Sequence, residues 1–310
     1  MPLGKGPTGV AVDPGTHTVY VANSDPESGD GTVSVLDGPT RIVNATVRVG
    51  KHAAGVAVDP GTHTVYIANS GDATVSVIDG ATHTVTSTVP VGDSPEQLAV
   101  DPGTHTVYVG ISDPHNGGGT VSVVDGATRT VTATVRVGKY LGGLAVDPGT
   151  HLVYVTNSND DTMSLIDGST HSVTATVPVG QWPDSVAVDP GANVVYVATR
   201  DPESAAHDST PPSRSGRVSV IDGSSHLVTA TVPIGKSPDG LAADPGTHTV
   251  YVAKYADDTV AVIDGPTHAV AATVRLDRGS LGHGVALDPA THTVYITNFN
   301  DGTVSVIERQ

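Results

Sequence analysis

The feature that most constrains this chain is a repeat that runs through its 310 residues. An Asp-Pro pair recurs at Asp13, Asp59, Asp101, Asp147, Asp189, Asp244 and Asp288. Consecutive pairs are 46, 42, 46, 42, 55 and 44 residues apart. The chain therefore contains seven copies of a unit slightly longer than forty residues, a period that is typical of repeat architectures.

Each copy has the pattern of four short β-strands. In the second copy these strands are expected at residues 55–59, 64–69, 74–79 and 84–91, which are rich in Val, Ile and Thr. One small sheet cannot bury both of its faces, whereas seven sheets packed around an axis can. We therefore predict an all-β fold, a seven-bladed β-propeller of four-stranded antiparallel blades. It forms a single domain over residues 1–310, with blades starting near residues 9, 55, 97, 143, 185, 240 and 284.

Several copies share a further motif, which reads YVAN at 20–23, YVTN at 154–157 and YITN at 295–298. Strands of the TVSV or TMSL type follow, ending in VIDG or a variant. These motifs resemble the YVTN-repeat β-propellers over nearly the whole chain. The resemblance implies the seven-bladed fold. Members of that group include surface-layer and secreted binding proteins, lactonase-like enzymes and metal-dependent antibiotic lyases, but no catalytic motif of these enzymes transfers to a numbered residue here.

The composition excludes several classes of partner. The formal net charge of −17 makes this an acidic protein that repels phosphate backbones, so we expect no nucleic-acid partner. No apolar run approaches the roughly 18 residues of a membrane span, so no membrane insertion is expected. No signal peptide is visible, which indicates a cytoplasmic protein if Met1 is the native start and a secreted one if an upstream signal was removed.

The ends of the chain suggest an incomplete seventh blade. The first residues align with the end of a fourth strand, and the chain stops in a third strand, at TVSVIERQ. The fourth strand of the last blade is then mostly missing, with only residues 1–3 to supply it. An unpaired strand edge can pair with another chain, so self-association through this blade is a possible partner interaction.

Antiparallel strands separate the connections into two faces. The turns between the first and second strands, and between the third and fourth, lie on one face, which we call the turn face. Their sequences are monotonous, mostly DPGTHT and DG, and suit tight turns. Histidines repeated in these turns are interpreted as turn residues. The remaining connections form the opposite face, the loop face, where the copies differ.

Every aromatic residue outside the repeat pattern belongs to the loop face. The connections between blades carry Tyr140 and Trp182, and the loops after the second strands carry Tyr255 and Phe299. Aromatic side chains supply stacking area in a ligand pocket. We therefore predict that Trp182, Tyr255 and Phe299 contact a ligand. Alternatively, Trp182 plugs the central channel, and Tyr255 and Phe299 only pack together.

Titratable groups on the same face are candidates for chemistry. His52 and His283 lie in the loops that connect one blade to the next, near the channel mouth, and imidazole titrates near neutral pH. We predict that they act as acid and base, with Tyr140 assisting and Asp184 serving as a base or orienting a histidine. The competing interpretation is that both histidines are solvated loop residues.

Charged residues complete the predicted site. Arg200 and Lys254 are expected to bind an anionic group or a carbonyl of the ligand, and Glu96 lies at a position related to that of Asp184. Alternatively, the two cations pair with Asp201, Asp257 or Asp258. We expect no cofactor, because a divalent metal would need His52 and His283 to converge with Glu96 or Asp184, and no ligand spacing supports this. The long insertion at residues 199–217 is interpreted as a flap.

Two functional hypotheses follow. In the first, the loop face binds a small aromatic or polycyclic organic molecule, and histidine acid–base chemistry promotes an elimination, a cyclisation or a lactone opening, as in a lyase, a cyclase or a lactonase-like hydrolase. In the second, the protein is a non-catalytic secreted or cell-surface propeller that docks a protein, peptide or glycan on that face. A deep pocket with a histidine at its floor would favour the enzyme, and a broad shallow surface would favour docking.

Overall fold

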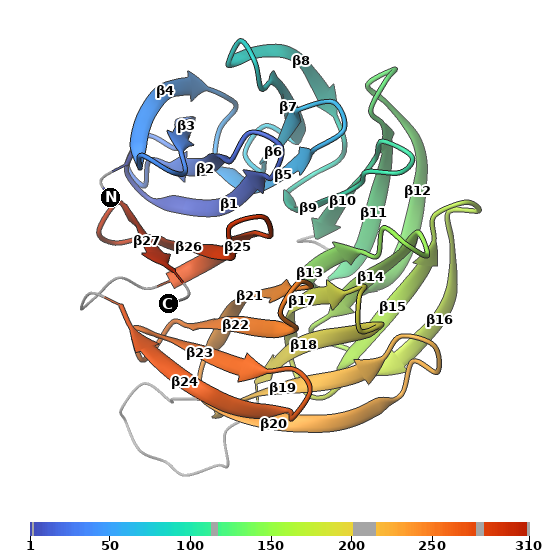
Figure 1. Ribbon diagram of the computed structural model, residues 1–310. Helices are drawn as coiled ribbons and strands as arrows, with labels where there is room; N and C mark the ends of the chain where they lie inside the picture. The colour runs from blue at the N-terminus through green and yellow to red at the C-terminus, as the bar shows by residue number, and fades with distance from the viewer. Residues whose placement is uncertain (2, 113–116, 201–214, 277–281, 309–310) are drawn as a thin grey trace.

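The computed structural model describes residues 1–310 except 2, 113–116, 201–214, 277–281 and 309–310. The described residues form strands and no helix. Seven antiparallel sheets stand as blades in a ring around a central axis (Figure 1), which confirms the predicted seven-bladed all-β propeller. Six blades have four strands, and the last blade has three. Within the described part of the chain, no helix is long and apolar enough to span a membrane.

The strands of each blade run in sequence order from the axis outward. The first three blades comprise β1 (Pro7–Asp13), β2 (Thr18–Ser24), β3 (Gly31–Asp37) and β4 (Ile42–Arg48); β5 (Ala53–Asp59), β6 (Thr64–Asn69), β7 (Thr74–Asp79) and β8 (Thr84–Pro90); and β9 (Pro95–Asp101), β10 (Thr106–Ser112), β11 (Gly118–Asp125) and β12 (Thr130–Lys139).

The other four blades follow the same order. They comprise β13 (Leu141–Val146), β14 (Leu152–Asn157), β15 (Thr162–Asp167) and β16 (Ser172–Pro178); β17 (Pro183–Asp189), β18 (Val194–Arg200), β19 (Ser215–Asp222) and β20 (Val228–Lys236); β21 (Pro238–Asp244), β22 (Thr249–Lys254), β23 (Thr259–Asp264) and β24 (Ala269–Arg275); and β25 (Gly282–Asp288), β26 (Thr293–Asn298) and β27 (Thr303–Ile307).

The hydrophobic core lies between neighbouring blades. The second and third strands are buried over most of their length, whereas the outermost fourth strands are largely exposed. In one cluster, Tyr108 and Val123 of the third blade pack with Val153 and Val155 of the fourth. Each blade buries its faces only against its neighbours. The apolar surface of the blades is therefore removed from water only when they assemble into the ring.

The turns between third and fourth strands are stabilised by aspartate side chains. In the fourth blade, Asp167 accepts hydrogen bonds from the Ser169 hydroxyl at 2.6 Å and from the Thr170 backbone N–H at 2.8 Å. The Ser169 hydroxyl is the main cause that lowers the pKa of Asp167 to about 2. Hydrogen bonds from turn residues likewise lower the pKa of the equivalent aspartates, Asp37, Asp79, Asp125, Asp222 and Asp264.

These lowered pKa values predict a loss of stability in acid. A carboxylate whose pKa is lower in the folded state stabilises the fold above its unfolded pKa of about 4, and loses this contribution as the pH falls through its folded value. D167N should therefore lower the melting temperature at pH 5, and the difference from wild type should shrink toward pH 2. Melting curves across this range measure the effect, with E27Q as an exposed control. A difference independent of pH would contradict the assignment.

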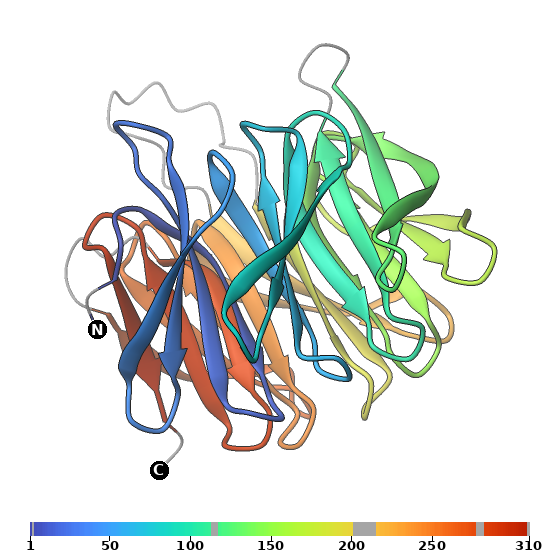
Figure 2. The same cartoon turned by 90° about the horizontal axis from the view of Figure 1, so that it is seen from above.

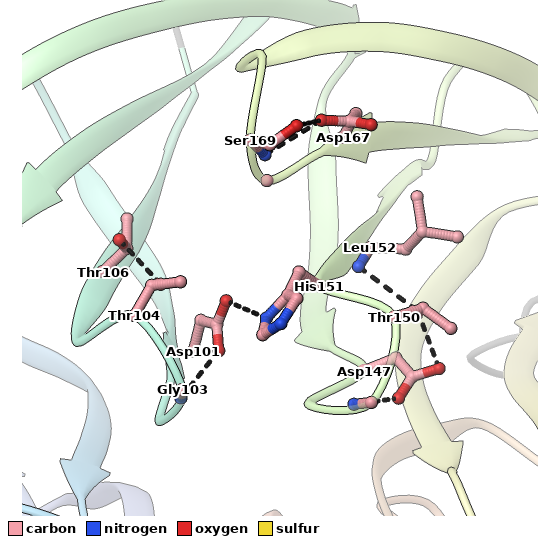
Figure 3. Close-up of polar contacts among 12 residues, drawn as sticks. Asp101, Gly103, Thr104, Thr106, Asp147, Thr150, His151, Leu152, Asp167 and Ser169 are labelled. Atoms are coloured by element: carbon pink, nitrogen blue, oxygen red, sulfur yellow. Dashed lines mark hydrogen bonds and ion pairs between the residues drawn. The ribbon is translucent and has the colours of Figure 1, made fainter.

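Neighbouring blades are joined on the turn face by histidine–aspartate hydrogen bonds, which we call latches. Each histidine donates from Nδ1 to the buried aspartate that ends the first strand of the preceding blade; Figure 3 shows the pair His151 and Asp101, 2.7 Å apart. The other pairs are His17–Asp288, His63–Asp13, His105–Asp59, His248–Asp189 and His292–Asp244, at 2.7–2.8 Å. The repeated histidines are thus contacts between blades as well as turn residues.

The junction between the fourth and fifth blades has no latch, because Asn193 occupies the histidine position. Asn193 has the same left-handed backbone as the latch histidines, with φ 54°. Its side-chain amide donates to the Ser224 hydroxyl at 2.8 Å. Asp147 is 4% exposed, and its carboxylate accepts only local hydrogen bonds, from Gly149 and Thr150, among the described residues.

N193H should therefore add the missing latch and stabilise the protein. Histidine adopts this backbone at the six equivalent positions, and the new bond would reach a buried carboxylate, so a gain of about 1 kcal/mol is expected after loss of the exposed bond to Ser224. Urea unfolding followed by circular dichroism measures the gain. In a D147A background N193H should give no gain; an equal gain there would show that the latch is not its cause.

The first residues of the chain close the ring beside β27. The Met1 amine donates to the Val304 carbonyl at 2.9 Å, the Val304 N–H donates to the Met1 carbonyl at 2.9 Å, and the Leu3 N–H donates to the Gly302 carbonyl at 2.7 Å. In the turned view of Figure 2, the N-terminus lies beside the C-terminal blade. This short segment supplies part of the missing fourth strand, and self-association through the rest of that edge stays a prediction.

Candidate functional site

A cavity of about 630 Å³ lies on the loop face, where the first strands of all seven blades surround the axis. The innermost part of its wall is apolar. The fourth residue of each first strand lines the cavity, namely Val10, Val56, Leu98, Leu144, Val186, Leu241 and Val285. The repeat thus builds an apolar ring, and ligand pockets commonly have this volume and lining.

Nearer the mouth, the second residue of each first strand forms what we call the pocket ring. All seven line the cavity: Thr8, Ala54, Glu96, Gly142, Asp184, Asp239 and His283. The register of each first strand shifts next to this position. Such irregularities re-aim side chains beside functional sites. Acidic and basic groups gather on blades three, five, six and seven.

His283 is held by a carboxylate from the neighbouring blade. Its Nδ1 lies 2.6 Å from an oxygen of Asp239, and both side chains are partly buried, with 35% and 27% of their surface exposed. The close approach of β21 and β25 makes this possible. A Cβ added to Gly240 would lie 2.1 Å from the His283 carbonyl oxygen, so glycine is required there.

Two aromatic rings flank His283. The ring of Tyr255 lies 5.1 Å from the imidazole between centroids, and the ring of Phe299 lies 5.6 Å away in an edge-on arrangement. Phe299 also lines the cavity, whereas Tyr255 is not among the lining residues. The structure therefore brings these two predicted ligand contacts together around the predicted acid–base residue, and both aromatic residues restrict the orientation of the imidazole.

Asp239 and His283 form what we call the dyad. A second charged pair, Arg200 and Asp184, lies next to it. Arg200 forms an ion pair with Asp184, donates from Nε to the Pro238 carbonyl at 3.1 Å and lies 3.9 Å from Asp239. Burial raises the pKa of Asp184 to about 6, and the charge of Asp239 adds to this, although Arg200 and His283 act in the opposite direction. Asp184 can therefore carry a proton near neutral pH, as a general acid must.

Glu96 lines the cavity from the third blade. Its side chain keeps exposed surface, yet the surrounding walls desolvate the carboxyl and raise its pKa. Within the described residues, no hydrogen bond or ion pair reaches this carboxyl group. Glu96 is thus a carboxylate that faces the cavity and has no counter-ion in the described part of the protein.

Tyr140 and Trp182 form the opposite aromatic pair at the mouth. Both line the cavity, and their ring centroids are 6.4 Å apart. Each follows a glycine-containing connection and has a left-handed backbone, with φ 59° and 46°. Smaller residues, Ser94 and Ser237, adopt the same backbone in other copies, so the turn itself does not need an aromatic residue. The large rings therefore serve the pocket wall.

Four of the predicted site residues do not line the cavity: His52, Arg200, Lys254 and Tyr255. His52 is exposed, and its ring packs against Gly29 and Gly71. Lys254 is buried, and its ammonium group lies 3.5 Å from Asp257. Neither residue is among those lining the cavity, so the structure does not bring His52 together with His283.

Sequence reasoning did not assign Asp239 a role in the site, although it holds His283. The available signal was its position, since Asp239, Asp184 and Glu96 all occupy the second residue of a first strand. Among the described residues, no group of three or more acidic, histidine or cysteine side chains is arranged to hold a metal ion. Residues 201–214, most of the predicted flap, lie outside the described residues.

Comparison with known proteins supports the fold. No family model and no curated protein sequence matches this chain. Among solved structures, it is similar to the hydrazine synthase of Kuenenia stuttgartiensis, with a TM-score of 0.85, 18% sequence identity, and coverage of 98% of this chain and 96% of that chain. At this identity the similarity shows the propeller fold alone.

Proposed function

We propose that the pocket on the loop face binds a small organic molecule and that His283 transfers a proton to or from it. The observation that carries this proposal is the hydrogen bond of 2.6 Å between Asp239 and His283 at the wall of a cavity of about 630 Å³. The apolar ring and the aromatic rings at the mouth suit an aromatic or polycyclic molecule. The YVTN-type motifs, which also occur in lactonase-like propellers, are consistent with this assignment.

The arrangement of the dyad favours proton transfer. Asp239 accepts a hydrogen bond from the Nδ1–H of His283 and stays ionised. This leaves the Nε2 lone pair of His283 to take a proton from the ligand, and the carboxylate then stabilises the imidazolium. Asp184, with its pKa of about 6, can return a proton to another atom of the ligand. An elimination, a cyclisation and a lactone opening all use such a pair of transfers. His52 has no part in this scheme, because it lies outside the cavity.

Ligand binding can be followed with the only tryptophan of the chain, Trp182. A library of lactones and aromatic compounds is screened for changes in its fluorescence, and turnover of the hits is measured by mass spectrometry. H283Q and D239N should keep binding within a few-fold and lower turnover by about 10²–10⁴-fold. H83Q, on the turn face, is the matched control. Turnover by H283Q at the wild-type rate would refute the proposed role.

A docking function is the second candidate, favoured by the exposure of the aromatic pair. Tyr140 is 54% exposed and Trp182 36% exposed, which is more than a closed pocket requires and is common in surfaces that bind proteins or glycans. Under this alternative, Y140A and W182A should abolish capture of a protein, peptide or glycan, while H283Q should leave capture unchanged.

A further inference from the structure

The charges of the pocket ring are mostly negative. Three of its seven members are carboxylates, Glu96, Asp184 and Asp239, and His283 is the only basic member. Carboxylates held in a concave, partly desolvated site attract cations more strongly than they would in water. The sign of the field in this cavity therefore depends on whether protein cations neutralise these groups.

Within the described part of the chain, the two cations that were predicted to bind the ligand pair with other protein groups. Arg200 is paired with Asp184, donates to the Pro238 carbonyl and reaches Asp239. Lys254 is paired with Asp257. Neither cation is among the lining residues, so the expectation that they would bind an anionic group of the ligand finds no support in their placement.

One carboxylate has no counter-ion among the residues that the structure describes. Glu96 lines the cavity on the third blade, and no described residue donates a hydrogen bond to it or pairs with it. Next to it along the ring, Tyr140 and Trp182 present aromatic surface at the mouth, and Phe299 does so from the seventh blade. Aromatic faces attract ammonium groups through their quadrupole, and the attraction is larger where water is excluded.

We propose that the ligand of this pocket is an organic cation, an amine or quaternary ammonium that carries an aromatic or apolar group. Glu96 is its counter-ion, the aromatic rings at the mouth surround the ammonium, and the apolar ring receives the hydrophobic part. This inference rests on the proposed function, because it assumes that the cavity is a ligand site.

Three probes with one aromatic ring and different charges test the inference: benzyltrimethylammonium, benzyl alcohol and benzoate. Calorimetry and Trp182 fluorescence measure their binding to the full-length protein. The cation should bind at least about tenfold more tightly than benzoate. E96Q should weaken binding of the cation about tenfold and should change binding of benzyl alcohol little. E27Q removes an exposed carboxylate outside the cavity and should leave the affinity for the cation unchanged.

The outcomes separate this inference from the proposed function. If benzoate or benzyl alcohol binds as tightly as the cation, or if E96Q and E27Q have the same effect, the inference is wrong while the pocket remains a ligand site. If none of the three probes binds, the inference is also wrong, and the lactone and aromatic library then decides the proposed function independently. A structural defect in E96Q would appear as a lower melting temperature.

Discussion

Replacing His151 with alanine should lower the free energy of unfolding by about 2 kcal/mol. His151 Nδ1 donates at 2.7 Å to Asp101, whose side chain is 1% exposed. Without this donor, the carboxylate keeps the Gly103 backbone N–H, 2.9 Å away, and stays buried with an unmet requirement for hydrogen bonds. The cost is large because a buried carboxylate cannot recover its lost partner from water.

His83 offers a matched control for this substitution. It lies in a tight turn of the same face with φ 54°, close to the 59° of His151, and its ring makes no hydrogen bond within the described residues. H83A therefore repeats the change in backbone preference without breaking a latch. Urea unfolding followed by circular dichroism compares the variants. If H83A and H151A destabilise the protein equally, the latch does not contribute to stability.

The second large effect concerns Asp184 and pH. Burial raises its folded pKa to about 6, above the unfolded value of about 4. Between these values the folded state binds a proton that the unfolded state has released, so the contribution of this group to stability is full below pH 4 and is lost as the pH rises through 6. D184N cannot ionise and should gain stability relative to wild type over this interval, by on the order of 3 kcal/mol.

Urea unfolding of wild type and D184N at intervals from pH 4 to 7 measures this difference. Subtracting the two curves removes the titration of the other carboxylates, including the turn aspartates, which act in the opposite direction. E27Q, which removes an exposed carboxylate, should give a curve parallel to that of wild type. Parallel curves for D184N would contradict the raised pKa. A gain in D184N would show that the site is maintained at a cost in stability, as functional sites often are.

Much of the pocket's lining could be predicted from the sequence. Variation among the repeats placed Tyr140, Trp182 and His283 on the loop face, and all three line one cavity. Their shared location follows from topology. In a ring of antiparallel sheets, the connections between blades and the loops after the second strands all lie on the same face of the ring. His52 belongs to the same face, yet its ring turns toward Gly29 and Gly71, since the direction of a loop side chain depends on local packing.

The sequence alone could not predict which charged side chains of the site pair with one another. Arg200 was expected to meet a ligand and instead meets Asp184, and Asp239 had no assigned partner before it was found beside His283. These partners come from different strands, and for Asp239 and His283 from different blades. The contact between Asp239 and His283 depends on how closely the first strands of two blades approach each other. Gly240 allows this close approach, but a glycine at this position in the sequence does not predict it.

The sequence by itself determined the number of blades, the order of their strands, the chemistry of the turns and the face on which the copies diverge, because these properties are local and recur with the repeat. The tertiary structure decided which side chains meet across blade junctions: the latches, their absence at Asn193, and the dyad of Asp239 and His283. These contacts join residues 44 to 59 positions apart, and 271 positions apart for His17 and Asp288, so their distances are set only when the ring closes and packs its blades against one another.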